Sequence, residues 1–420
     1  MNRNQGAGAP GLFGLATMLL VDRVQRRSDA DPARVLCRWA GLQPVEDGTI
    51  SVRTPGRRVA LVVDGERSRQ ILDASPASGA CPPGRLKRKA MSFLAPRALT
   101  IAHGEDWARL RAFHERVLDF DHRYPLAQRF LDRVRAAFAQ PVHSPEDIRR
   151  AMGKAMLGIV PGDASREGLL DDVQALFEAV QSPVRRMLLG FRYRRVRERL
   201  YEDLRGRVRQ GAAADPGDLM DLALQEQPPA DEDELIQQIP HWMFTFTGSG
   251  TDLLTRTLAL ITARAEVHRR VRDELAGAGA LDQAATLSAL RYTEACLLEA
   301  GRLFPPAART FHRSADDKTE IAHWFPLLHR DPALGDSVDA FRPERWLNVD
   351  HDAAADASLL FLRGPRRCPG QPLILFVCKA ALARQLGEIG FGVRASRLSM
   401  DPLPVRFPLA KANFHPETPS

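Results

Sequence analysis

Cysteine is scarce in this chain: five of its 420 residues are cysteine, at positions 37, 81, 296, 368 and 378. Their number is odd, they are widely spaced, and no two of them form a Cys-x-x-Cys pair. This pattern argues against a disulfide framework and against a zinc site built on paired cysteines. Any cysteine with a chemical role therefore has to act alone.

Long apolar runs are missing as well. The most apolar segment near the start, residues 12–21, has ten residues, which are too few to span a bilayer. Arg3 precedes it as in a signal peptide, but no Ala-x-Ala-like cleavage site follows before Asp22. We therefore predict a short helix packed on the body of the protein, no membrane span and a cytoplasmic location.

The charges form no block of one sign. Lysine and arginine number 59 against 52 aspartates and glutamates, which leaves a net charge of +7. Basic and acidic residues alternate, as between Arg194 and Arg209. A nucleic-acid-binding protein would concentrate its positive charge in one block, so we expect no nucleic-acid partner.

A regular alternation of strands and helices is also absent. The apolar residues follow the 3.6-residue period of a helix over 126–138, 169–180, 184–208, 235–262, 267–275, 287–303 and 373–386. Strand-like patterns are confined to 49–52, 59–63, 319–324 and 405–409, and linkers are expected at 225–232 and 348–357. We predict a mainly α fold with a small β portion.

One short motif suggests a dinucleotide site. Gly6-x-Gly8-x-x-Gly11 matches the dinucleotide-binding fingerprint, but no strand precedes it and Pro10 interrupts it. We interpret it as part of a flexible tail. No nicotinamide or flavin domain is therefore predicted, and electrons for a redox reaction would come from another protein.

The most informative segment is Phe-Leu-Arg-Gly-Pro-Arg-Arg-Cys-Pro-Gly, which runs from Phe361 to Gly370 and precedes a long apolar helix. Cys368 is thus expected at a helix N-terminus, where free N–H groups and the dipole favour a thiolate. Gly364 and Gly370 allow tight turns and a close approach of the backbone to a flat ligand. A partly buried thiolate flanked by arginines suits one axial bond to a haem iron, and a structural cysteine beside a turn is the alternative.

This segment resembles the haem-binding loop F-x-x-G-x-R-x-C-x-G of the cytochrome P450 family at every defining position. Other segments resemble motifs of that family in the same order: Trp107-x-x-x-Arg111, Glu299-x-x-Arg302 and Phe341-Arg-Pro-Glu-Arg345-Trp. The resemblance extends from about residue 30 to the end and is to the bacterial, soluble haem-thiolate monooxygenase type. It implies a single catalytic domain over 1–420, with β-rich parts near 45–65, 310–330 and 395–412. The haem would lie between a long distal helix and the cysteine loop.

The resemblance implies a role for each matching residue around the cysteine. Cys368 would be the proximal thiolate ligand of haem b, and Phe361, Gly364 and Gly370 would shape its loop. Backbone N–H groups after Cys368 would hydrogen-bond the sulfur and tune the iron. Glu299, Arg302 and Arg345 would form a buried ion network, although an i, i+3 pair alone is more often a solvated helix pair.

The haem propionates would be held by Trp107, Arg111 and Arg366 through charge-assisted hydrogen bonds. Another basic residue usually follows the Glu-x-x-Arg helix in this family. His312 stands at that place with Arg313 next to it, so either could make the contact. A surface histidine on a strand is the alternative.

The predicted distal helix has the sequence Thr-Gly-Ser-Gly-Thr-Asp at 247–252. A glycine in a helix costs about 1 kcal/mol relative to alanine, so a close approach to haem and O2 would explain Gly248 and Gly250, with a plain kink as the alternative. The family places an acid before the alcohol here; Thr251 matches the alcohol, but Gly250 takes the place of the acid. Asp252 lies about 200° around the helix from that place. We expect Thr251 and ordered water to deliver protons to O2 without the acid.

The resemblance also implies partners. An external ferredoxin with its reductase would dock on a positive face formed by Arg109, Arg363, Arg367, Lys379 and Arg384, unless these are an ordinary solvated surface. A largely hydrophobic small molecule would contact the loop 82–102, the distal helix, residues 307–311 and the turn at 407–409, with Phe244, Thr247, Ala308 and Phe407 as candidate wall residues. Arg85, Lys87, Arg88 and Lys89 could meet an anionic group, but we prefer a solvated loop face for these four.

The leading hypothesis is a monooxygenase that inserts one atom of O2 into its substrate, as a tailoring step of secondary metabolism. Gly250 supports a haem-thiolate enzyme of another class: a peroxide-driven oxygenase, a rearrangement catalyst or a nitrogen-group transferase. A non-catalytic haem sensor is the remote alternative.

Overall fold

The computed structural model describes residues 40–416 except 41, 44, 55–56, 75, 79, 122–123, 163–165, 182, 227–230, 315–316, 332–336, 349–358, 394–396, 400 and 409–411. The helix predicted at 12–21, the tail around Gly8 and Cys37 lie outside the described residues. So do nearly all of the linker predicted at 348–357 and the middle of the one at 225–232.

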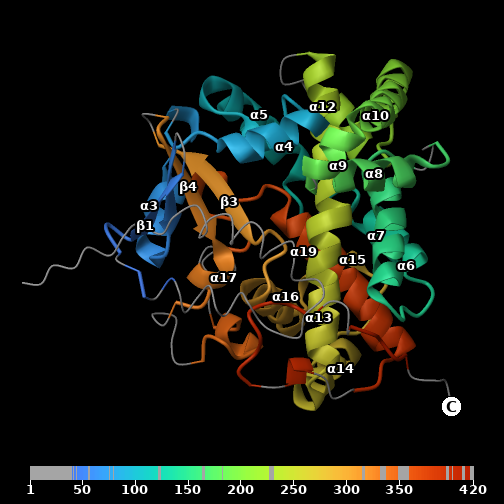
Figure 1. Cartoon of the computed structure of the whole chain (residues 1–420). Helices are drawn as coiled ribbons and strands as arrows, with labels where there is room; N and C mark the ends of the chain where they lie inside the picture. Colours follow the sequence, from blue (N-terminus) through green and yellow to red (C-terminus); the bar gives the residue numbers. More distant parts are fainter. Residues whose placement is uncertain are drawn as a thin grey trace, which may run out of the picture.

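A small mixed sheet forms one side of the molecule (Figure 1). β1 (Thr49–Thr54) and β2 (Arg57–Val62) are antiparallel neighbours, and β2 pairs in parallel with β4 (Thr319–Trp324). β3 (Arg309–Arg313) completes the order β1-β2-β4-β3 at the other edge. Side chains alternate between faces along a strand, so β3 buries Thr310 and His312 on one side.

The strand predicted near 405–409 is wrong for the residues that the structure describes there. Residues 401–408 form bends without a β ladder. Pro402, Pro404 and Pro408 lack the N–H that a strand needs for its ladder, so this segment pairs with no strand. The β portion is therefore smaller than predicted.

Helices build the larger part of the described chain, as predicted. They are α3 (Gly65–Asp73), α4 (Arg85–Leu94), α5 (Gly104–Leu118), α6 (Ala127–Ala137), α7 (Pro145–Ile159), α8 (Leu169–Gln181), α9 (Pro183–Leu188), α10 (Gly190–Gln210), α11 (Leu219–Gln225), α14 (Ala265–Gly277), α15 (Ala284–Ser288), α16 (Arg291–Leu303), α17 (Phe325–Leu328) and α19 (Gln371–Leu382). α4 lies within the segment 82–102 that we expected to be a loop. No helix of the described part of the chain is long and apolar enough to cross a membrane.

One long rod crosses the molecule from end to end in Figure 1. It consists of α12 (Glu232–Thr245), the π-helical turn η4 (Phe246–Gly250) and α13 (Thr251–Thr262). Asp231 caps its start by accepting a hydrogen bond from the Glu234 N–H at 2.7 Å. The prediction of one continuous α-helix over 235–262 missed the π turn, which falls on the two glycines.

α16 and α19 are the innermost helices. All residues of α16 from Tyr292 to Leu303 are buried, and so are Leu373 to Leu382 of α19. A helix that is buried all round belongs to the interior of a protein. These two helices therefore fix the positions of the Glu299–Arg302 pair and of the cysteine loop that precedes α19.

Candidate functional site

The cysteine loop is closed by its own backbone. The Cys368 N–H donates to the Phe361 carbonyl at 2.7 Å, and the Arg367 N–H donates to the Gly364 carbonyl at 3.1 Å. Gly364 has a φ of +53°, and a Cβ at this position would lie 2.6 Å from Asp73 Oδ1 at the end of α3. A glycine is therefore required there by both its conformation and its neighbour.

The Cys368 thiol sits just before the N-terminus of α19. Burial raises the pKa of this thiol, while a hydrogen bond from the Gly370 N–H and the charges of Arg111 and Arg367 act to lower it. Burial has the larger effect, so the protein alone keeps the pKa above its ordinary value. A metal cation bound to the sulfur is what would convert such a thiol to a thiolate.

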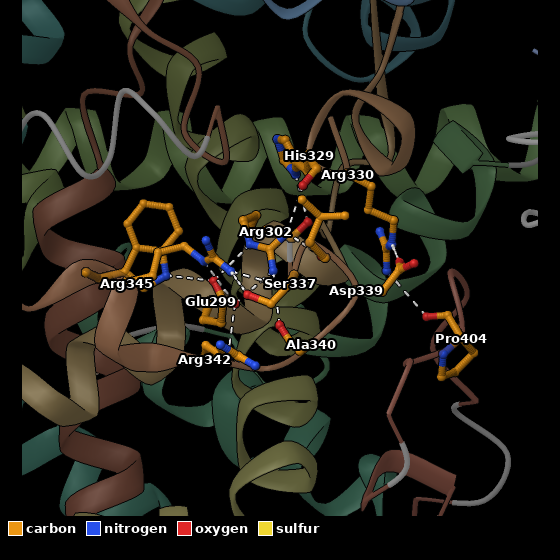
Figure 2. A network of polar contacts seen from close by, with 12 residues as sticks. Glu299, Arg302, His329, Arg330, Ser337, Asp339, Ala340, Arg342, Arg345 and Pro404 are labelled. Atoms are coloured by element: carbon orange, nitrogen blue, oxygen red, sulfur yellow. Dashed lines mark hydrogen bonds and ion pairs between the residues drawn. The ribbon is translucent and has the colours of Figure 1, made fainter. Parts of the chain in front are cut away.

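The ion network expected around Glu299 is present in the structure (Figure 2). Glu299 and Arg302 are 0% and 1% exposed and form two hydrogen bonds of 2.8 Å, and Arg345 Nε lies 3.4 Å from Glu299 Oε1. The Arg302 guanidinium also donates to the carbonyl oxygens of His329 and Val338 at 2.8 Å and of Ala340 at 3.2 Å. The pair is thus a buried structural clamp and not a solvated helix pair.

The structure adds members to this network that we did not predict. The Trp346 indole N–H donates to Glu299 Oε2 at 2.8 Å, and the Arg342 backbone N–H donates to Glu299 Oε1 at 3.1 Å. Beside them, Arg330 pairs with Asp339 at 2.8 Å and donates to the Pro404 carbonyl at 3.3 Å (Figure 2). Trp346 directly follows Arg345 in the sequence, so its position next to a predicted member of the network could have identified it.

The distal glycines lie against side chains of two other helices. A Cβ at Gly248 would lie 2.3 Å from the Phe177 ring of α8, and a Cβ at Gly250 would lie 2.9 Å from Ile374 Cδ1 of α19. Close packing of these two neighbours is therefore sufficient to require glycine. Thr251 is 3% exposed, and its hydroxyl donates to the Phe246 carbonyl across the π turn at 3.2 Å.

The Asp252 carboxylate and the Thr251 hydroxyl have different hydrogen-bond partners. Its carboxylate pairs with Arg256 at 2.7 Å, and Arg256 also donates to the Phe304 carbonyl at the end of α16. Asp252 is thus engaged on another side of α13, in agreement with its expected position around the helix. It is not placed as a substitute for the missing acid.

The four candidate wall residues each have identified neighbours in the structure. Phe244 packs on Phe177 with ring centroids 4.7 Å apart, and the buried Thr247 hydroxyl donates to the Met243 carbonyl at 2.9 Å. Phe407 instead packs edge-on against Phe304 at 5.3 Å, near Arg256. The carbonyl of Ala308 accepts the Phe325 N–H at 3.0 Å.

A small apolar cavity adjoins the first of these groups. The residues that line it come from α4, α8, α10 and α12: Leu94, Val173, Leu176, Phe177, Leu200, Pro240 and Phe244.

Basic side chains gather where propionate ligands were expected. The Arg111 guanidinium donates to the Arg367 carbonyl next to Cys368, and Arg366 donates to the carbonyls of Ala80 and Cys81 at 3.0 Å. His312 is 3% exposed, so it is not a surface histidine, and its ring lies edge-on to His323 at 5.3 Å. Arg313 is paired with Asp317, while the charge of Arg366 acts on His312.

This basic cluster fits the carboxylates of a haem. Buried nitrogen atoms without a hydrogen-bond partner remain on Arg366 (Nε) and His312 (Nδ1). Burial and the nearby charges of His323, Arg366 and Lys87 hold the pKa of His312 well below its usual range. Arg111 is paired with Glu115 at 2.7 Å, so the unpartnered nitrogen atoms and the positive charge of Arg366 beside the cysteine loop are what an anionic cofactor edge would satisfy. Trp107 lies one turn before Arg111 on α5 and is half-buried.

The predicted positive docking face is largely neutralised. Arg109 pairs with Glu234 and Asp106, Arg363 with Asp73, and Arg384 with Glu388. The prediction for Lys379 is wrong: it is 4% exposed and pairs with Glu294 of α16 at 2.7 Å. Lys379 faces inward because α19 is buried on every side.

The protein was compared with known sequences. A family model described as Cytochrome P450 matches residues 170–391, which is just over half of the chain. A cytochrome P450 monooxygenase of Aspergillus fumigatus is 27% identical over 226 residues, 47% of this chain and 40% of the relative. Geranylhydroquinone 3''-hydroxylase of Arnebia euchroma is 27% identical over 46% of this chain and 44% of the relative, and cyclooctatin synthase of Streptomyces melanosporofaciens is 36% identical over 30% and 29%. The matched part spans less than half the length of each of these relatives.

Proposed function

Because this chain belongs to the cytochrome P450 family, we propose that it is a haem-thiolate monooxygenase that inserts one atom of O2 into a largely hydrophobic organic molecule. The single observation that carries the proposal is the Cys368 loop. Its sulfur accepts the Gly370 N–H, and its backbone is closed onto Phe361. The buried Glu299–Arg302 clamp holds the neighbouring segments in place.

The residues of the chain have separable tasks in this reaction. A bound haem would supply O2 binding and activation, with Cys368 as its axial thiolate and Arg366, His312, Trp107 and Arg111 as candidates to hold its propionates. Thr251 is the candidate for proton delivery, because its hydroxyl is buried in the π turn. Phe177 and Phe244 would contact the substrate and exclude water.

Electrons would come from a separate ferredoxin and reductase, as in soluble bacterial members of this family. The proposal rests on the absence of a flavin or nicotinamide motif with the required strand context in the sequence. Because Arg109, Arg363 and Arg384 each have an acidic partner, docking would depend more on shape than on a strong positive field. A tailoring step of secondary metabolism, in the cytoplasm, is the context that we propose.

A second function is favoured by one observation, the lack of an acid before Thr251. Gly250 stands there, and Asp252 is engaged with Arg256. A peroxide-driven oxygenase, a rearrangement catalyst or a nitrogen-group transferase needs no proton relay of the usual kind. Peroxide-driven and redox-neutral reactions differ from the monooxygenase reaction in needing no ferredoxin.

The deciding experiment compares metabolites of the source strain with those of a strain that carries Cys368→Ala. A compound that accumulates in the variant is the substrate, and the compound that disappears is the product. A mass difference of one oxygen atom supports an oxygenase, and a requirement of the purified protein for a ferredoxin and its reductase then distinguishes the monooxygenase from a peroxide-driven oxygenase. Equal masses, or a difference other than oxygen, would overturn it in favour of the second function.

A further inference from the structure

Two buried histidines are neighbours on one face of the small sheet. His312 of β3 and His323 of β4 are 3% and 0% exposed, and their rings meet edge-on with centroids 5.3 Å apart. In the antiparallel ladder His312 lies opposite Ile321, so His323 is its diagonal neighbour two residues further along β4 and on the same face. The proposed function uses His312 as a candidate propionate ligand and gives His323 no task.

A serine from the neighbouring helix holds the ring of His323. Ser68 of α3 is 0% exposed, and its hydroxyl oxygen lies 3.0 Å from His323 Nδ1. The topology explains this contact. In the parallel ladder His323 is paired with Val62, the last residue of β2, and α3 follows β2 almost directly in the chain. Ser68, one turn into α3, is therefore brought over the same part of the sheet.

The contact with Ser68 determines which nitrogen of His323 carries the proton. A neutral imidazole has one N–H and one bare nitrogen, whereas a hydroxyl can donate and accept. If Ser68 donates to Nδ1, one group is left unsatisfied, the N–H at Nε2. If Nδ1 donates instead, both the serine O–H and the bare Nε2 lack a partner among the described residues. Because each buried polar group without a partner costs free energy, Ser68 is the donor and His323 carries its proton on Nε2.

The adjacent ring of His312 has the complementary unsatisfied atom. His312 Nδ1 is buried without a hydrogen-bond partner, as His323 Nε2 is. Burial lowers the pKa of His323 to about 3 and holds that of His312 well below its usual range, so both rings are neutral. A neutral pair can satisfy both atoms when one nitrogen is an N–H and the other is bare. The N–H is on His323, which leaves His312 Nδ1 as the acceptor and puts the proton of His312 on Nε2.

We propose that His323, held by Ser68, is a positioning residue for His312: its Nε2–H donates to His312 Nδ1, directly or through one water molecule, and so presents the His312 Nε2–H to a propionate of the haem. The inference rests on the proposed function and deepens it. Arg366 supplies positive charge to the propionate, and His312 supplies a neutral donor whose proton is confined to one nitrogen. The hydrogen bond to the propionate is therefore set by three elements, α3, β4 and β3.

The first measurement locates the protons by nitrogen NMR of the haem-loaded protein with isotope-labelled histidine. The ferrous carbon-monoxide form is used because it is diamagnetic. The chemical shift of each ring nitrogen then shows whether it is protonated or bare. In the unmodified protein His312 and His323 should both be protonated on Nε2 alone. A proton on Nδ1 of either histidine would overturn the proposal.

The second measurement compares variants by the same spectra and by the haem reduction potential. His323→Leu and Ser68→Ala should each let His312 populate both tautomers. The potential should fall in both, because a propionate with a weaker hydrogen bond keeps more negative charge and stabilises ferric iron. His323→Gln retains an acceptor for Ser68 and an N–H donor, so it should restore the tautomer and the potential. Ile321→Val is the matched control, since it removes one methylene and no polar atom opposite His312, and should change neither.

The outcomes separate a positioning role from simple packing. An unchanged His312 tautomer in His323→Leu would overturn the proposal, and so would a potential in His323→Gln or Ile321→Val as low as in His323→Leu. If His323→Leu does not fold, the spectra of the unmodified protein and of Ser68→Ala give the answer. Failure of the unmodified protein to bind haem would instead remove the proposed function itself.

Discussion

Arg302 and His329 hold each other by two reciprocal hydrogen bonds. The Arg302 guanidinium donates to the His329 carbonyl at 2.8 Å, and His329 Nδ1 donates to the Arg302 carbonyl at 2.8 Å. Both residues are 1% exposed. The end of α16 is thereby locked to the segment after α17, and Glu299 extends the lock to Arg345 and Trp346.

This arrangement predicts a graded response to substitutions. Arg302→Ala leaves the Glu299 carboxylate buried without its main partner and should cost about 3–5 kcal/mol of unfolding free energy, with loss of haem. Trp346→Phe removes one hydrogen bond to a charged group and should cost about 1.5–3 kcal/mol. Urea unfolding and haem content measure both effects.

The matched control is Arg342→Ala, because its side chain is exposed and only its backbone N–H contacts Glu299. It should change the unfolding free energy by less than about 0.5 kcal/mol. A loss for Arg342→Ala as large as that for Trp346→Phe would show that the segment 342–346 matters as a whole and not through Glu299.

A buried histidine on α5 predicts sensitivity to acid. His114 accepts the Trp242 indole N–H on Nδ1 at 3.3 Å, so its Nε2–H donates to Gln238 at 3.1 Å and the ring is neutral. Burial lowers the pKa of His114 to about 3, against about 6.5 in the unfolded chain. Below pH 6.5 only the unfolded state takes up the proton at this histidine, so the contribution of His114 to stability falls as the pH falls, by about 1.4 kcal/mol per pH unit down to about pH 3.

The measurement is the unfolding free energy between pH 7.5 and 4.5 for three proteins. The unfolding free energy of His114→Gln should decline less steeply toward acid pH than that of the unmodified chain, because the unfolded variant takes up one proton fewer. His143→Gln, an exposed histidine, serves as the control and should keep the original slope. Identical slopes for all three proteins would contradict the assignment to His114.

Removal of the Thr251 hydroxyl is expected to lower the amount of product formed per electron consumed. Thr251→Ala should reduce the product formed per electron consumed to on the order of a tenth, with hydrogen peroxide released instead, because positioned proton transfer contributes about 10²–10⁴-fold. Thr257→Ala is the control, since Thr257 is buried and its hydroxyl donates to the carbonyl four residues back at 2.7 Å. An unchanged yield in Thr251→Ala would remove proton delivery from this residue.

The sequence predicted those features that are set by neighbours along the chain. Glu299 and Arg302 lie one turn apart on a helix, and Cys368 lies where a glycine-rich loop meets an apolar helix, so spacing alone brings these groups together. The inward position of Lys379 depends on α16, which is remote in sequence and supplies its partner Glu294, and it follows from the covering of α19 on all sides. A prediction from the sequence pattern places lysine on a solvated face, because burying its charge costs free energy.

Gly250, which stands where the family has an acid, packs against Ile374 of α19. This contact between remote segments predicts that substitutions at the two positions change the unfolding free energy non-additively. Gly250→Ala would put a Cβ 2.9 Å from Ile374 Cδ1, so overpacking of about 1–3 kcal/mol should outweigh the gain of about 1 kcal/mol in helix propensity. In an Ile374→Val background the Cδ1 atom is absent, and Gly250→Ala should become neutral or stabilising. Gly206→Ala in α10 meets only Arg209 Nη2 at 3.9 Å and should stabilise in both backgrounds. The measurement is urea unfolding. If the changes in unfolding free energy for Gly250→Ala and Ile374→Val are additive, Ile374 is not what excludes a side chain at position 250.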